Sequence, residues 1–173
     1  MSSVVDICNS ALNQIGASNI ISLTEDSKAA RVCNQRYEFV RDSVFRAHPW
    51  NCLTVRRTLS PDTAAPAFEF TKQFTLPTDP YCLRVLALDE PDVLYRIEGR
   101  KLLCNESTIN MIYIGRETDP AQYDMLLMET ISASLAADIA YNLVGSSEDN
   151  AINTSVVSDS RTIAADTFIN SRF

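Results

Sequence analysis

Residues 27–51 read SKAARVCNQRYEFVRDSVFRAHPWN, and this stretch decides how the first third of the chain folds. Its apolar residues recur at steps of three or four positions: Ala30, Cys33, Tyr37, Val40, Val44 and Ala47. This spacing places them on one face of a helix. Pro49 disfavours helical backbone at His48. The stretch therefore predicts a long helix that ends near Ala47.

Helices are also predicted on either side of this stretch. Residues 3–15 place apolar side chains on one face, and Gly16 follows as a left-handed C-cap. The long helix has three candidate N-caps: Ser22, Asp26 and Ser27. A third helix is expected to begin at Asp119-Pro120 and to end at Gly145, because apolar residues repeat every four positions between them. A weaker helical pattern follows in residues 150–173.

The middle of the chain changes to the two-residue period of β-strands. Six segments show this period or are short apolar runs between turns: 53–59, 68–76, 81–88, 93–98, 101–105 and 109–115. Gly99-Arg100 joins two of them as a tight hairpin. The connections are too short for crossover helices, so the strands are expected to pair antiparallel.

These elements predict an α+β fold. We expect a helical bundle of three to four helices with an antiparallel β-rich insertion between the second and third helices. Residues 1–50 supply the first helices, 51–116 the insertion, and 117–173 the C-terminal helices and tail. With 173 residues and no Gly/Ser-rich linker, the chain is expected to be a single domain.

Charge is distributed unevenly along the chain. The net charge of −7 comes from 15 Lys+Arg and 22 Asp+Glu. Residues 117–173 alone carry 2 basic and 9 acidic residues, a net of −7. Such a surface repels phosphate and argues against ordinary nucleic-acid binding. It is either a solvated helix face or a surface that stays near DNA without binding it.

The N-terminus and the hydropathy pattern bear on location. The first residues, MSSVVD, have no basic patch and reach an acid at once, unlike a secretory signal. No stretch approaches the roughly 20 apolar residues that a membrane span needs. We therefore expect a protein made and kept in a cytoplasm, with no membrane association.

Few residues are available for catalysis. The five cysteines lack a CxxC pair and are expected to be small core residues: Cys8, Cys33, Cys52, Cys82 and Cys104. The one histidine, His48, forms a thiol dyad only if Cys33 or Cys52 lies within hydrogen-bond reach. Its place beside proline and tryptophan favours a packing or capping role. We expect no catalytic residues and no enzyme activity.

Acidic and basic doublets provide no recognisable site. Three acidic pairs lie beside turn or cap residues, where solvated acids are common: Glu25-Asp26, Asp89-Glu90 and Glu148-Asp149. Arg56-Arg57 and Arg100-Lys101 are interpreted as strand-edge charges. No metal-ligand spacing and no phosphate-binding glycine loop occurs in the sequence. No cofactor and no metal are therefore expected.

The end of the long helix supplies the expected structural anchors. They are Tyr37, His48, Pro49 and Trp50. Trp50 is expected to be buried between the helix end and the first strand, because tryptophan is highly buried on average. Exposed, it would instead be a binding hot spot.

The same stretch resembles a known family. Residues 27–37, 40–44 and 47–51, leading into a strand with Arg56-Arg57, resemble the tail tubular protein A family of bacteriophage head-to-tail adaptors. Four later segments are similar in the same order: FTLPTD (74–79) with CLRV (82–85), EGR (98–100) with Leu102-Leu103, Tyr113-Ile114, and TDP (118–120). The resemblance covers residues 3–145.

The resemblance implies a structural virion protein of the head-tail junction, made in a bacterial cytoplasm. Such adaptors form a ring, usually of twelve subunits, between the portal protein and a downstream tail protein: a nozzle, tube or terminator. DNA passes through the lumen without specific binding. C-terminal segments in this family reach the portal, which implies partner-binding roles for Ile163, Phe168, Arg172 and Phe173.

Two other functions remain open on the sequence. One is a tail-completion or tail-terminator protein, which forms a ring that binds tail tube rather than portal. The other is a small thiol hydrolase that uses His48 with Cys33 or Cys52. That enzyme requires a cleft that brings thiol and imidazole together.

Overall fold

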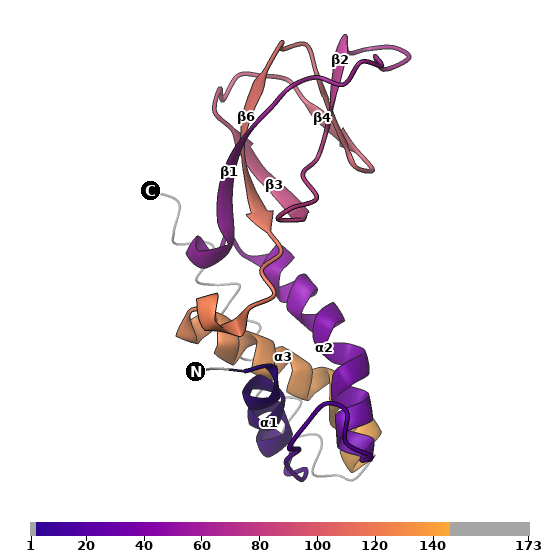
Figure 1. The fold of residues 1–173 in the computed structure, drawn as a ribbon, viewed down its shortest axis with the longest axis vertical. Coiled ribbons are helices and arrows are strands. Elements are labelled where there is room, and N and C mark those ends of the chain that lie inside the picture. Colours follow the sequence, from indigo (N-terminus) through magenta and orange to yellow (C-terminus); the bar gives the residue numbers. More distant parts are fainter. Residues whose placement is uncertain (1–2, 146–173) are drawn as a thin grey trace. The chain divides into compact units, whose positions relative to one another are not determined.

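A computed structural model describes residues 3–145 of the chain. The fold is α+β: the described residues contain three α-helices and two small antiparallel sheets (Figure 1). The chain divides into a helical unit, Met1–His48 with Thr118–Phe173, and a β unit, Pro49–Glu117. The expected partner-binding residues Ile163, Phe168, Arg172 and Phe173 and the helical pattern in 150–173 lie outside the described residues.

Helix α1 spans Val4–Gln14, which confirms the predicted first helix. Ser3 caps it through a capping box: its hydroxyl accepts from the Asp6 N–H, and the Asp6 carboxylate accepts from the Ser3 N–H. Gly16 follows at φ 69°, the left-handed conformation predicted for it. Both ends of α1 are therefore set by local sequence.

Helix α2 spans Lys28–Ala47, so the predicted end at Ala47 is confirmed. Of the three candidate N-caps, Ser27 caps the helix through its hydroxyl, which accepts from the Ala30 N–H at 3.1 Å. His48 follows with extended backbone, as expected before proline. The predicted apolar face of α2 is buried along most of its length: Ala30, Cys33, Tyr37, Val40 and Val44, together with Phe45.

Helix α3 spans Met125–Val144, and its predicted start at Asp119-Pro120 is wrong. Asp119 instead caps a short 3₁₀ turn, η2 (Pro120–Gln122). The α-helix begins only after Asp124, whose carboxylate accepts from the Leu127 N–H at 2.7 Å. Asp119 and Asp124 both fit the N-cap pattern, and the prediction from the sequence placed the start of the helix at Asp119. The predicted end at Gly145 is confirmed, with φ 79°.

Contacts of α3 hold the helical unit together. Helix α3 packs against both α1 and α2. The Gln14 amide donates to the Ser132 hydroxyl at 2.9 Å, and Phe45 meets Tyr123 edge to face, with ring centroids 5.5 Å apart. The apolar core includes the following buried residues of α3: Leu127, Ile131, Leu135, Ala136 and Ile139. The periodic apolar residues of all three helices thus serve one core.

The β unit contains two three-stranded sheets, and the predicted antiparallel pairing is confirmed. The first sheet has the order β1-β6-β3, with bounds Thr54–Leu59, Ile109–Gly115 and Cys82–Leu88. The second has the order β2-β5-β4, with bounds Lys72–Thr75, Lys101–Cys104 and Arg96–Glu98. A 3₁₀ turn, η1 (Asn51–Leu53), precedes β1.

The strands differ from prediction mainly at their ends. Residues 68–71 were predicted as strand but lie outside β2, and 93–95 lie outside β4. The hairpin between β4 and β5 is confirmed: Glu98 pairs with Lys101, and Gly99 has φ 57°. Both sheets contribute to one buried cluster: Phe74, Leu76, Cys82, Leu102, Cys104, Ile109, Met111 and Tyr113. The unit therefore has a core of its own.

No helix among residues 3–145 is long and apolar enough to cross a membrane.

Candidate interaction surfaces

The expected anchors are divided between the two units: Tyr37 and His48 belong to the helical unit, and Pro49 and Trp50 belong to the β unit. Tyr37 and Trp50 are buried, with exposed fractions of 4% and 7%. The Trp50 carbonyl accepts from the Leu53 N–H at 3.1 Å and from the Thr54 hydroxyl at 2.8 Å, so it fixes the turn that leads into β1. His48 is half-buried, and burial lowers the pKa of its imidazole.

The structure separates His48 from Cys33. Both belong to one continuous stretch, because Cys33 lies in α2 and His48 is the C-cap of that helix. Fifteen residues at the α-helical rise place them about 22 Å apart. A thiol–imidazole dyad of these two residues is therefore excluded.

Four of the five cysteines are buried, as expected for core residues: Cys8, Cys33, Cys82 and Cys104. The expectation is wrong for Cys52, which is exposed in the turn η1. Cys8 and Cys33 lie on facing helices within hydrogen-bond reach, and this contact, together with burial, raises the pKa of the Cys8 thiol. A thiol held protonated in a core is a poor nucleophile.

The acidic doublets act mainly through backbone and local contacts. Glu25 accepts from the Ile21 N–H at 2.7 Å, and Asp26 pairs with the exposed Arg31. These contacts fit the predicted role of turn and cap residues. Glu148-Asp149 lies outside the described residues.

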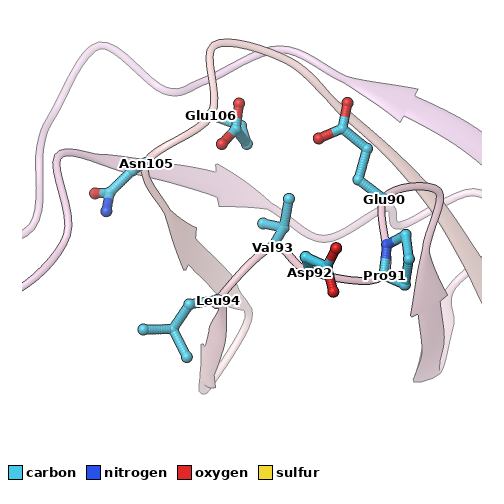
Figure 2. Close-up of a pocket in the computed structure, with 7 residues that line it drawn as sticks. All are labelled: Glu90, Pro91, Asp92, Val93, Leu94, Asn105 and Glu106. Atoms are coloured by element: carbon cyan, nitrogen blue, oxygen red, sulfur yellow. The ribbon is translucent and has the colours of Figure 1, made fainter.

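A hollow of about 420 Å³ lies beside Glu90 in the β unit. Its lining comes from two segments, residues 90–94 and Asn105-Glu106 (Figure 2). The acids Glu90, Asp92 and Glu106 give it a negative charge. No group of three or more His, Cys, Asp or Glu placed to hold a metal ion occurs in residues 3–145. The hollow is thus an acidic surface feature.

The two basic doublets have different roles. Arg56-Arg57 lies on β1, an edge strand, as interpreted from the sequence. The same interpretation is wrong for Arg100-Lys101, because β5 is the central strand of its sheet and Arg100 lies in the hairpin turn. Lys101 pairs with Asp62, and hydrogen bonding to Lys101 lowers the pKa of that carboxyl.

Arg100 holds the loop that follows β2. Its guanidinium donates to the carbonyls of Leu76, Pro77 and Cys82 at 2.5–3.2 Å. The same group lies over the Tyr81 ring, 4.0 Å from the centroid. These contacts join the two ends of the Pro77–Tyr81 segment through one side chain.

Exposed apolar side chains are a surface feature that the sequence pattern did not predict. In the helical unit they are Ile21, Phe39, Met125, Leu126, Tyr141 and Val144. In the β unit they are Phe68, Leu94 and Ile97. Phe68 is 81% exposed, although it was predicted to lie within a strand. The sequence pattern does not distinguish Phe68 from Phe70. Both are phenylalanines at alternate positions, yet only Phe70 is buried.

The chain matches no protein-family model and no curated protein.

Proposed function

We propose that the protein is a bacteriophage head-to-tail adaptor: a structural virion protein that forms a ring between portal and tail and lines the DNA channel. The resemblance in residues 27–51 suggests this function. The observation that carries the proposal furthest is the surface of α3, which offers apolar side chains beyond those buried in its own unit. A ring subunit needs such surfaces, since each copy contacts two neighbours and at least one other protein.

Helix α3 is apolar on more than one face. Leu127, Ile131 and Leu135 are buried within the helical unit. Met125 and Leu126 at its start are 79% and 63% exposed. A helix that is apolar around most of its circumference is normally buried on all sides. The open side of α3 is therefore a candidate surface for another subunit.

This side of α3 continues as a row of small residues. Half-buried side chains with three- and four-residue spacing run along it: Thr130, Ala133, Ala137 and Ala140. Leu126 stands at the first end of the row and Val144, 41% exposed, at the last. Small residues at this spacing allow a second helix to approach closely. The row supports a protein partner rather than a small ligand.

The element order supports the finer architecture of this proposal. The strands β1 to β6 all follow α2 and precede α3 in the chain. We propose that the helices form the body of the subunit and that the β unit is an insertion between the second and third helices. The number of helices in the body is three, or four if residues 146–173 add one.

Charge supports a channel role. The described part of the acidic third, residues 117–145, contains five acids and no Lys or Arg: Glu117, Asp119, Asp124, Glu129 and Asp138. Asp138 is bound by Arg36 in a two-bond ion pair. An acidic wall repels phosphate and lets DNA slide. In this proposal the partners are the portal, a downstream tail protein and further copies of the chain, twelve in all by the family's usual number. The residues that bind the portal are Ile163, Phe168, Arg172 and Phe173.

The proposal assigns no catalytic role to any residue. The ring acts by position alone, at the head-tail junction of the virion, after synthesis in the bacterial host. Ring formation uses the surfaces described above, and DNA ejection passes through the lumen. Nothing in this activity requires a cofactor or a metal.

Negative-stain electron microscopy tests the proposal. The purified full chain is imaged alone and after mixing with the portal protein of the same phage. In the mixture we expect rings of this chain stacked on portal rings. The chain imaged alone is expected either to form rings or to remain monomeric until portal is added. A monomer that never joins portal would refute the adaptor function, and a ring that binds tail tube but not portal would identify a tail terminator.

A further inference from the structure

Two buried cysteines of the helical unit face each other. Cys8 lies on α1 and Cys33 lies on α2, and both are 0% exposed. The two helices contact each other, and the Cys8 S–H donates a hydrogen bond to the Cys33 sulfur. The two thiols are therefore neighbours in the core, although they lie 25 residues apart in the sequence.

Neighbouring contacts hold this pair in position. Tyr37 lies one turn after Cys33 on α2 and is 4% exposed. Burial is the main cause that raises the pKa of the Tyr37 hydroxyl, and the nearby Cys8 thiol adds to this. On α1, the Asn9 side chain donates to the Ile20 carbonyl at 2.9 Å and accepts from the Ile20 N–H at 2.8 Å, which fastens the α1–α2 connection to α1. Cys8 thus faces the side of α2 that carries Cys33 and Tyr37.

The hydrogen bond makes the two thiols chemically different. It lowers the pKa of the Cys33 thiol, because the Cys8 S–H stabilises the Cys33 thiolate. The same hydrogen bond, together with burial, raises the pKa of the Cys8 thiol. The thiolate is the form of cysteine that attacks a disulfide. Cys33 is therefore the nucleophile of the pair, and Cys8 is the thiol that reacts second.

We propose that Cys8 and Cys33 are a site of reversible disulfide formation that joins α1 to α2. The oxidant is a small-molecule disulfide. The Cys33 thiolate attacks one of its sulfurs, which forms a mixed disulfide and releases one thiolate. Cys8 then loses its proton to solvent and attacks the Cys33 sulfur, which releases the second thiolate. The pair loses two electrons and two protons, and the oxidant becomes two thiols.

The surroundings of the pair decide when this reaction occurs. Both sulfurs are buried, so exchange proceeds through local openings that separate α1 from α2. A reducing cytoplasm keeps the pair as thiols, and an oxidising medium closes the bond. A bond across 25 residues restricts the unfolded chain and is expected to lower the unfolding equilibrium constant on the order of a hundredfold. The inference goes beyond the proposed adaptor function and does not depend on it.

Equilibrium with glutathione tests the site. The full chain carries Cys52→Ser, because Cys52 is exposed and would form mixed disulfides of its own. Reduced and oxidised samples are each brought to equilibrium in mixtures of reduced and oxidised glutathione, once folded and once in concentrated urea. Free thiols are then alkylated and the chain is digested with trypsin. The bond joins the peptide 1–28, which contains Cys8, to the peptide 32–36, which contains Cys33.

The folded chain is expected to favour the bond more than the unfolded chain does. We expect the equilibrium constant for the linked peptides to be larger by about tenfold or more in the folded chain than in urea, because the fold already holds the two thiols together. By thermodynamic linkage, oxidation must lower the unfolding equilibrium constant by the same factor. Cys33→Ala is expected to remove the linked peptide, and Cys104→Ala, which changes a buried cysteine of the β unit, is expected to leave it unchanged.

Two results would overturn the proposal. One is an equilibrium constant in the folded chain no larger than that in urea, because the native arrangement would then not favour the bond. The other is a set of linked peptides that join Cys8 or Cys33 mainly to Cys82 or Cys104. Neither measurement uses rings or portal, so the outcome is separate from the test of the adaptor function.

Discussion

Replacing Arg100 with alanine tests how the β unit is held together. The guanidinium donates to three carbonyls and lies over the Tyr81 ring. A hydrogen bond from a charged donor contributes about 1.5–3 kcal/mol to stability, and less of this is lost when water can replace the donor. Arg100 is only half-buried, so water can reach the freed carbonyls and the lower end applies. Three bonds at this lower end and about 0.5 kcal/mol for the ring contact amount to about 5 kcal/mol, so we expect Arg100→Ala to lower the free energy of unfolding by roughly 4–5 kcal/mol.

The geometry also predicts the effect of a conservative change. Lysine keeps the charge but carries one compact ammonium in place of a planar fork with five N–H donors. It cannot reach three carbonyls on both sides of the loop and stack on the ring at once. We therefore expect Arg100→Lys to recover less than half of the loss.

Tryptophan fluorescence during urea unfolding measures both variants. Trp50 is the single tryptophan of the chain and belongs to the β unit, so its emission reports on this unit. Arg56→Ala is the matched control, because Arg56 is exposed on an edge strand, and its cost is expected to stay within about 0.5 kcal/mol. A loss for Arg100→Ala no larger than that of the control, or wild-type stability for Arg100→Lys, would refute the reasoning.

Three further predictions concern packing, an ion pair and pH. Gly115→Ala places a Cβ about 3.2 Å from Pro80, so we expect a loss of about 1–3 kcal/mol in urea unfolding. Asp138→Asn weakens the two-bond pair with Arg36, which is partly exposed, and is expected to cost about 0.5–1 kcal/mol, with a smaller effect at high salt. Burial lowers the pKa of His48, so the stability it contributes is present above its ordinary pKa of about 6.5 and is lost as the pH falls through the lowered value. Thermal melts of His48→Gln should therefore fall less between about pH 7.5 and about pH 5 than those of the wild type; an equal or larger fall contradicts this.

Local signals were sufficient for most element boundaries. Pro49 follows the end of α2, Gly16 follows α1, and Gly99 lies in the hairpin, all as predicted, and the N-cap of α2 is Ser27, one of three candidates. Each of these boundaries depends on the backbone preference of one residue and its immediate neighbours, which can be read from the sequence. The start of α3 was misplaced because two aspartates five residues apart both satisfy the capping pattern.

The burial of individual side chains was harder to predict from the sequence. Cys52 was expected in the core and is exposed, whereas Arg100 was expected at a strand edge and binds three carbonyls. Residue type gives only an average tendency to be buried. The actual burial depends on which distant segment arrives next to the residue.

The sequence by itself determined the α+β class, the order of helices and strands, and their antiparallel pairing, because periodicity, caps and short connections act over a few residues. Only the tertiary structure decided that Arg100 holds a loop and that Phe68 remains in water. These depend on contacts between segments distant in sequence. The ion pair between Glu69 and Arg96 has the same origin, because these two residues meet only in the folded chain.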